Sequence, residues 1–368
     1  MTSRSEKTAT HSDLSSKLLE WYDLFGRDLP WRQRGAHSNP YTVWVSEIML
    51  QQTTVKTVIP YFYRFMEHYP TVESLAAADI EDVLFLWQGL GYYTRARKLH
   101  ECARCIVDRY GGAFPKTYSE LLKLPGIGPY TAASISSLAF DKREAVVDGN
   151  VIRVISRLYG ISESTASSLP EIKKKAQALM PEYRAADYTS AIMDLGATVC
   201  TPKNAICTSC PFQGECAAFR DGTVQSIPKI EKISKIEKIG KVFWIENEDG
   251  KVFIQKRTEK GLLFGLTEFP WAAVEVGTGG NLNEGPSTVK NIPFPIAGKE
   301  WTDTGRHVKH IFTHIRLTLY IYKVKIQTSK FISADGQFVR REEFEAYPFS
   351  TLMKKVIREM DQLKPSED

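Results

Sequence analysis

The chain has 368 residues, of which 43% are hydrophobic and 25% charged, and its formal net charge is +5. Its length suggests about two or three domains of a soluble globular protein, and its six cysteines are too few for a disulfide scaffold. No window approaches the roughly 18 apolar residues of a membrane span, and the opening stretch MTSRSEKTATHSDLSS lacks the apolar core of a secretory signal. We therefore expect a cytoplasmic protein with no membrane partner. Its basic charge permits a nucleic-acid partner without requiring one.

The first part of the chain, from residue 13 to about 220, is predicted to be mostly helical. Gly and Pro mark the breaks between the helices, as in QGLGYY and LPGIGP. Apolar residues recur at helical spacing in the segments 14–25, 58–69, 80–87, 96–110 and 170–180.

The pattern changes after Cys216. Ile recurs at every third position from 230 to 239, a spacing that fits neither a helix nor a strand, and we interpret 229–240 as a linker that enters a strand near its end. The segments KVFWI and KVFIQKR flank ENEDG and predict a β-hairpin. Alternation in IFTHIRLTLYIYKV predicts a strand, and PFSTLMKKVIREMDQL predicts a closing helix. This second part is therefore expected to be α+β.

Four cysteines stand close together as C-x6-C-x2-C-x5-C, at Cys200, Cys207, Cys210 and Cys216. Four thiolates suit a tetrahedral zinc ion or an iron–sulfur cluster, and the spacing alone leaves both open. The remaining pair, Cys102 and Cys105, lies within an apolar helical pattern and is predicted to be buried in a helix.

Two further stretches can each be interpreted as a structural feature or as part of a functional site. In LPGIGP, Gly126 and Gly128 flank Ile127 before Pro129, and free N–H groups at such a turn can bind a DNA phosphate, although a plain interhelical turn fits equally well. In AVVDGNVIRV, Asp148 fits a helix N-cap or a catalytic carboxylate, and this stretch alone favours the cap.

The hairpin, Asp148 and the cysteine run occur in the order found in the helix–hairpin–helix DNA glycosylase superfamily with an iron–sulfur cluster, which residues 14–220 resemble. The motifs RDLPWR, VWVSEIMLQQT and GLGYYTRARKLH resemble adenine DNA glycosylases of the MutY type. Further on, GLLFGLTEFP and FTH resemble the Nudix-like domain appended to those enzymes.

The resemblance implies a multidomain protein with an all-α helix–hairpin–helix glycosylase core, a cluster loop and an α+β Nudix-like C-terminal domain. We expect the catalytic region to span 1–228, with a hairpin-bearing six-helix subdomain at about 34–140 and a cluster subdomain formed by 1–33 and 141–228. The linker would follow at 229–240, and the 8-oxoguanine-recognition domain at 241–368.

The implied activity is base excision repair. The enzyme would flip adenine mispaired with 8-oxoguanine or guanine out of double-stranded DNA and hydrolyse its N-glycosidic bond. We expect a monomer that acts at the nucleoid and holds a [4Fe-4S] cluster on the four cysteines; a monovalent cation at the hairpin is left open.

The resemblance also assigns the chemistry. Glu47, in an apolar run, would have a raised pKa and protonate adenine, while an ionised Asp148, held by Asn150, would stabilise the cationic sugar. Tyr130 stands where strand-cleaving relatives carry a Schiff-base Lys, which implies a monofunctional enzyme, and it would hydrogen-bond near Asp148.

The implied DNA contacts fall into three groups. Ser190 stands where the family commonly has Glu or Gln, which puts one adenine contact in doubt. Residues near the adenine pocket are Arg27, Trp31, Arg32, Leu50 and Ser190; those that wedge into or bind the duplex are Gln52, Thr53, Leu90, Tyr92, Gly126 and Gly128; those facing 8-oxoguanine are Phe312, Thr313 and His314.

The C-terminal domain is expected to bind without hydrolysing, because only the isolated Glu275 and Glu284 follow the Nudix-like stretch in place of a magnesium-binding carboxylate cluster. For FTH, an ordinary strand is the alternative. Two rival functions remain: a bifunctional glycosylase/lyase on oxidised pyrimidines, which Tyr130 disfavours, and a non-catalytic iron–sulfur damage sensor, which the retention of Glu47 and Asp148 disfavours.

Overall fold

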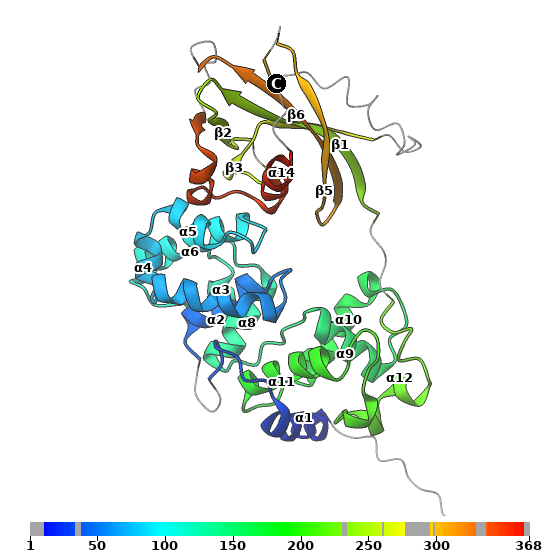
Figure 1. Ribbon diagram of the computed structural model, residues 1–368. Helices are drawn as coiled ribbons and strands as arrows, with labels where there is room; N and C mark the ends of the chain where they lie inside the picture. The colour runs from blue at the N-terminus through cyan, green and yellow to red at the C-terminus, as the bar shows by residue number, and fades with distance from the viewer. Residues whose placement is uncertain are drawn as a thin grey trace, which may run out of the picture. The chain divides into compact units, whose positions relative to one another are not determined.

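The computed structural model describes residues 11–33, 38–229, 234–259, 261–276, 295–296, 299–328 and 336–363. Two compact units emerge from it: Met1–Ala78 with Arg97–Glu231, and Asp79–Ala96 with Lys232–Asp368 (Figure 1). The first is helical and the second contains a β-sheet, so the expected multidomain class, all-α followed by α+β, is confirmed. Among the described residues, no helix has the length and apolar character needed to cross a bilayer.

The helical unit is built from short helices joined by tight turns. Its members are α1 (His11–Phe25), α2 (Pro40–Leu50), α3 (Val55–His68), α4 (Val72–Ala77), α6 (Thr94–Tyr110), α7 (Tyr118–Leu121), α8 (Pro129–Phe140), α9 (Gly149–Tyr159), α10 (Thr165–Ala178), α11 (Ala185–Thr198) and α12 (Ala217–Arg220). Two 3-10 turns, η1 (Cys207–Ser209) and η2 (Gln213–Glu215), lie within the cysteine run.

Local sequence explains where these helices begin. Asn39 caps α2 by accepting from the backbone N–H of Tyr41, and Pro40 occupies the first turn, where its missing N–H costs nothing. Thr54 caps α3 in the same way. Gly128 precedes α8 without a side-chain cap, so the N–H groups at that helix start have no capping side chain.

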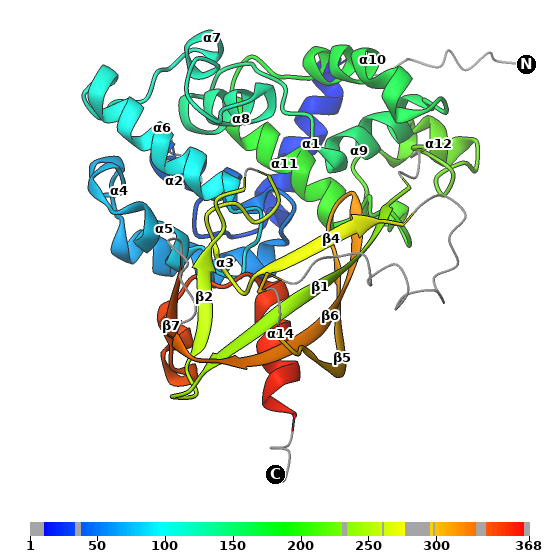
Figure 2. The same ribbon diagram turned by 90° about the horizontal axis from the view of Figure 1, so that it is seen from above.

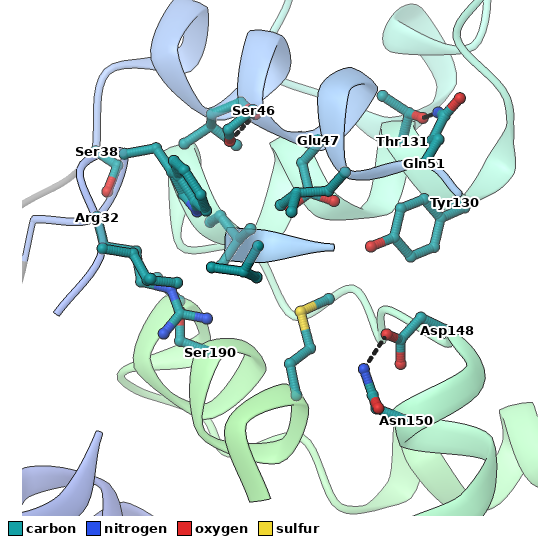
Figure 3. A pocket seen from close by; sticks show the side chains of 18 of the residues that line it. Arg32, Ser38, Ser46, Glu47, Gln51, Tyr130, Thr131, Asp148, Asn150 and Ser190 are labelled. Atoms are coloured by element: carbon teal, nitrogen blue, oxygen red, sulfur yellow. Dashed lines mark hydrogen bonds between the residues drawn. The ribbon is translucent and has the colours of Figure 1, made fainter. Parts of the chain in front are cut away.

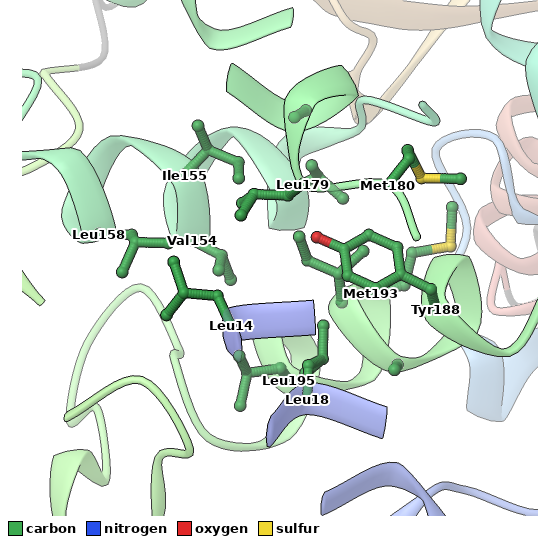
Figure 4. Close-up of a cluster of buried hydrophobic side chains, with 14 of the residues drawn as sticks. Leu14, Leu18, Val154, Ile155, Leu158, Leu179, Met180, Tyr188, Met193 and Leu195 are labelled. Carbon is green, nitrogen blue, oxygen red and sulfur yellow. The ribbon is translucent and has the colours of Figure 1, made fainter. Parts of the chain in front are cut away.

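An apolar core holds α1, α9 and α11 together (Figure 4). Leu18 of α1, Ile155 of α9 and Leu195 of α11 are each fully buried there. At Gly196 of α11 a Cβ atom would lie 2.6 Å from the Cβ of Asn150, so glycine is needed for the close approach of α11 to the start of α9. This packing fixes the position of the segment that carries Asp148.

The second unit is centred on one sheet. Its strands are β1 (Ile236–Asn247), β2 (Val252–Lys256), β3 (Thr267–Glu268), β4 (Trp271–Glu275), β5 (Thr302–Ile311), β6 (Ile315–Ile326) and β7 (Gly336–Val339). The order is β3-β2-β1-β6-β5, while β4 pairs with β1 and β7 with β2. The predicted hairpin is confirmed, because β1 and β2 pair antiparallel with Glu246 opposite Val252.

The linker prediction is wrong for residues 236–240, which belong to β1; residues 230–233 lie outside the described part of the chain. Side chains three apart in a strand point to opposite faces, so Ile236 is exposed while Ile239 is buried. From Ile239 to Ile245 every residue of β1 is buried, and a strand covered on both faces shows no alternation in its sequence.

Each face of the sheet has its own core. Trp244, Leu319 and Val356 belong to the larger cluster, in which α14 (Thr351–Asp361) lies against the sheet (Figure 2). Phe243 and Phe253 belong to a smaller cluster on the other side. The 3-10 turn η5 (Arg341–Ala346) contributes Phe344 to the larger one.

The short segment Asp79–Ala96 groups with the sheet. It contains α5 (Ile80–Leu86), and Glu81 forms an ion pair with Lys256. The side-chain amide of Gln88 donates to the backbone carbonyls of Tyr347 and Phe349, at 3.0 and 3.2 Å. The C-terminal unit is therefore discontinuous in sequence.

Candidate active site

The helical unit encloses a cavity of about 880 Å³ between α2, α8, the start of α9 and α11. Figure 3 shows Glu47 and Tyr130 facing this space from one side and Asp148 from the other. The structure brings together most of the predicted site residues around this cavity: Arg27, Trp31, Arg32, Glu47, Leu50, Gln52, Thr53, Gly126, Gly128, Tyr130, Asp148, Asn150 and Ser190.

Glu47 lies in the middle of α2 and is buried, with 5% of its surface exposed. Burial raises the pKa of its carboxyl, as does nearby Asp148, while Tyr130, Ser134 and Arg32 oppose this rise. Its Oε2 atom has no completed hydrogen bond within the described protein. Burial therefore favours the protonated form of this carboxyl, which is the form that can donate a proton.

Asp148 is both an N-cap and a pocket residue. Its Oδ1 accepts from the backbone N–H of Val151 at 2.7 Å, which caps α9, and its Oδ2 accepts from the side-chain amide of Asn150 at 2.9 Å. The two interpretations of this residue are therefore compatible, because the same carboxylate serves the helix and faces the cavity (Figure 3).

Arg153 connects this pair to the cysteine run. Its guanidinium donates to Asn150 Oδ1 at 2.8 Å, to the carbonyl of Gly196 at 2.6 Å and to the carbonyl of Cys200 at 2.6 Å. A continuous set of hydrogen bonds thus runs from the first cysteine to the Asp148 carboxylate. Arg153 was not predicted from the sequence, because its partners Gly196 and Cys200 lie more than 40 residues away.

Tyr130, at the start of α8, points its hydroxyl toward the space between the two carboxylates (Figure 3). Burial raises its pKa well above the usual value, and both Glu47 and Asp148 raise it further. The phenol therefore remains protonated and can act only as a neutral hydrogen-bonding group.

Asp194 was also missed by the sequence analysis, although an acid inside the apolar helix IMDLGA is a usable signal. Its carboxylate is fully buried on α11 and accepts from Arg27 and Arg32 at 2.6 to 2.9 Å. Burial alone would raise the pKa of Asp194, but Arg32 and Arg27 outweigh burial and lower it. The ion pairs with Asp194 hold both arginines at the cavity wall.

The two glycines of the hairpin, Gly126 and Gly128, have different structural roles. Gly126 has φ +74°, and a Cβ there would lie 2.6 Å from the Cβ of Lys98, so the fold itself needs glycine. Gly128 has ordinary backbone angles, and a Cβ would meet nothing within 4 Å. The open space at Gly128 and the N–H groups that no side chain caps suit an anion that approaches from outside.

Gln52 and Tyr92 both have positive φ, at 60° and 50°, which is unfavourable for side chains of this size. Tyr92 is 48% exposed, and its hydroxyl is 2.5 Å from Oγ1 of Thr313, within the same unit. Leu90, by contrast, is buried. The strained backbone presents two of the predicted wedge residues.

Phe312, Thr313 and His314 form the turn between β5 and β6, and the interpretation of FTH as part of a strand is wrong. The N–H of Phe312 donates to the carbonyl of Ile315 at 2.8 Å, which closes the turn and leaves Thr313 and His314 exposed. Glu275 pairs with Lys238 at 3.2 Å, and Glu284 lies outside the described residues.

The four clustered cysteines line one small cavity together with Arg157, whose guanidinium lies 3.4 Å from Cys200 Sγ. Four thiols around one space are a suitable donor set for an iron–sulfur cluster. Among the described residues, no group of three or more His, Cys, Asp or Glu side chains is arranged to hold a metal ion. Both remaining cysteines lie on α6 as predicted, but only Cys102 is buried, while Cys105 is half-buried.

Two family models match the chain. Residues 45–182 match the HhH-GPD superfamily base excision DNA repair proteins, and residues 241–359 match the NUDIX domain.

Curated relatives and solved structures extend these matches. The adenine DNA glycosylase of Rattus norvegicus is 36% identical over 93% of this chain and 76% of its own length. That of Mycolicibacterium smegmatis is 42% identical over 56% of this chain and 71% of its own. A thermostable thymine-DNA glycosylase of known structure superposes with a TM-score of 0.52 at 29% identity, over 57% of this chain and 97% of that chain.

Proposed function

The chain belongs to the adenine DNA glycosylases and removes adenine from DNA in base excision repair, and from this premise we propose that its substrate is adenine opposite 8-oxoguanine or guanine, released by hydrolysis without strand cleavage. One observation supports the chemistry above all: Glu47, whose pKa is raised by burial, and Asp148 line one cavity from opposite sides. The two carboxyl groups divide the work as an acid and a charge stabiliser.

Glu47 acts on the leaving base. A purine leaves readily only when protonated, and the raised pKa of Glu47 favours the protonated form that supplies this proton. Arg27 and Arg32, fixed by Asp194, line the same cavity and provide donors to a flipped base. Ser190 is buried in the cavity wall and is too short to make the direct contact of a longer amide or carboxylate.

Asp148 acts on the sugar. As the glycosidic bond breaks, positive charge develops on the deoxyribose, and an ionised carboxylate at the helix mouth stabilises it, electrostatically or through a transient covalent bond. Asn150 and Arg153 hold the carboxylate in place. Because Tyr130 provides a neutral phenol in place of an amine, no Schiff base forms and water completes the reaction.

The test is single-turnover excision on duplexes that hold adenine opposite 8-oxoguanine, guanine or thymine. We expect base loss on the first two, strand cleavage only after alkali, and no trapping by borohydride. Glu47→Gln should be inactive because an amide cannot deliver the proton. Strand breaks that keep pace with base loss would contradict monofunctional hydrolysis.

We also propose that Cys200, Cys207, Cys210 and Cys216 hold a [4Fe-4S] cluster, supported by the common cavity that they line. Such a cluster would supply structural support to the loop that follows α11, and no step of the excision passes through it. Anaerobically prepared protein should contain about four irons per chain; zinc in their place would contradict the assignment.

A further inference from the structure

Glu47 has a neighbour on α8 that the steps above leave unused. Ser134 lies one helical turn after Tyr130, so the two side chains share a face of α8, and α8 packs against α2, which carries Glu47. Ser134 is fully buried. Hydrogen bonding by its hydroxyl lowers the pKa of both the Glu47 carboxyl and the Tyr130 phenol.

Two oxygens at this point, Ser134 Oγ and Glu47 Oε2, complete no hydrogen bond within the described protein. A buried hydroxyl without a partner destabilises a fold, and an alanine would fill the same place without that cost. The carboxyl beside it changes charge during the reaction. It is neutral before the proton is delivered and anionic afterwards, and only the anion needs a further donor.

We propose that Ser134 is a positioning residue for the acid, whose hydroxyl donates to Glu47 Oε2 as the proton passes to adenine. In this step the O–H bond of Glu47 breaks, an N–H bond forms on the adenine ring, and the electron pair of the broken bond stays on the carboxylate. The Ser134 hydrogen bond stabilises that buried charge when it appears. The inference rests on the proposed role of Glu47 as the acid.

The surroundings of Glu47 define what Ser134 adds. Tyr130 on α8 also lowers the pKa of Glu47, Asp148 before α9 raises it, and Arg32, between α1 and α2, lowers it. Arg32 is already bound to Asp194. Ser134 thus adds a second hydroxyl donor beside Tyr130, and within the described residues its own hydroxyl has no hydrogen-bond partner.

Ser134→Ala should slow single-turnover excision of adenine opposite 8-oxoguanine by about ten- to hundredfold, the usual worth of a hydrogen bond to a charged group. Since Ser134 lowers the pKa of Glu47, its removal raises that pKa. The acid works in its protonated form, so the alkaline limb of the pH–rate profile should move to higher pH. The thermal midpoint should stay the same or rise, because an unpartnered hydroxyl is lost.

Ser136→Ala is the matched control. Ser136 lies on the same helix, is equally buried and is equally without a partner, but it does not act on Glu47. Its replacement should leave the rate and the pH profile unchanged. Ser134→Cys restores a weak donor of similar size and should give an intermediate rate.

A wild-type rate and pH profile in Ser134→Ala would overturn the inference. So would a slower rate with a lower thermal midpoint and an unmoved alkaline limb, because that combination indicates a packing role alone. Glu47→Gln on the same duplex tests the role of Glu47 separately from that of Ser134. If Glu47→Gln retains activity, Glu47 is not the acid. If Glu47→Gln is inactive while Ser134→Ala behaves as wild type, only the proposed role of Ser134 is wrong.

Discussion

Asp148 performs two tasks that substitutions can separate. Asn caps a helix about as well as Asp, so Asp148→Asn should preserve α9, the thermal midpoint and DNA binding. It removes the charge that is needed only as the sugar becomes cationic, so excision should be abolished. Gel-shift binding and single-turnover excision on one duplex measure the two tasks, and near-normal excision would contradict the electrostatic role.

Asp194 makes the stability of the pocket depend on pH. Asp194→Asn leaves two arginines without a counter-charge and should lower the free energy of unfolding by about 3 kcal/mol, the low end for a broken buried pair because Arg27 is partly exposed. The pKa of Asp194 is lower in the folded state. Its contribution is therefore fully present above about pH 4, the unfolded value, and is lost as the pH falls through the folded value.

Urea unfolding of the wild type and of Asp194→Asn, at pH 7 and at acid pH, tests this linkage. The difference in the free energy of unfolding between the two proteins should be largest at pH 7 and should become smaller on acidification. A difference that does not change with pH would show that Asp194 acts through packing.

At the scale of elements, structure that depends on neighbouring residues could be predicted from the sequence, whereas pairings between distant segments could not. Helical spacing predicted α1, α3 and α10, and a capping Asp predicted the start of α9. The sequence showed no sign of β5, and it placed β1 too late, because β1 is buried on both faces and its partner β6 begins 79 residues further on, with Ile236 opposite Ile315. Asp194 was missed for the same reason: its arginine partners lie 162 and 167 residues away.

The start of α9 depends on Arg153, which ties it to α11 and to the cysteine run. Arg153→Met keeps the length of the side chain but removes these bonds. We expect a lower thermal midpoint and slower excision, with DNA affinity unchanged, because Asn150 loses the contact that orients it toward Asp148. Arg220→Met is the control, because the exposed Arg220 side chain forms an ion pair with its neighbour Asp221. A wild-type excision rate in Arg153→Met would show that Asn150 needs no such support.

At the scale of the whole molecule, we expect excision and recognition of the opposite base to be separable. Thr313→Val removes the hydroxyl at the β5–β6 turn, including its bond to Tyr92. It should reduce the preference for 8-oxoguanine over guanine by about 1–3 kcal/mol, the value of one hydrogen-bonded base contact, while excision itself continues. His314→Ala should act in the same direction.

Thr302→Val, at the exposed start of β5, provides the comparison for these variants. Single-turnover rates on the two duplexes give the preference directly. If Thr313→Val and His314→Ala both keep the full preference, the turn does not read the opposite base.

The discontinuous C-terminal unit has a consequence for synthesis. Gln88 binds the carbonyls of Tyr347 and Phe349, which lie 259 and 261 residues later in the chain. A ribosome adding about 5–20 residues per second needs on the order of half a minute to supply them. During that time α5 and the Tyr92 loop have emerged while the sheet that completes their unit is still being made. A nascent chain arrested before residue 347 should therefore leave this segment open to protease, even where the helical unit has already folded.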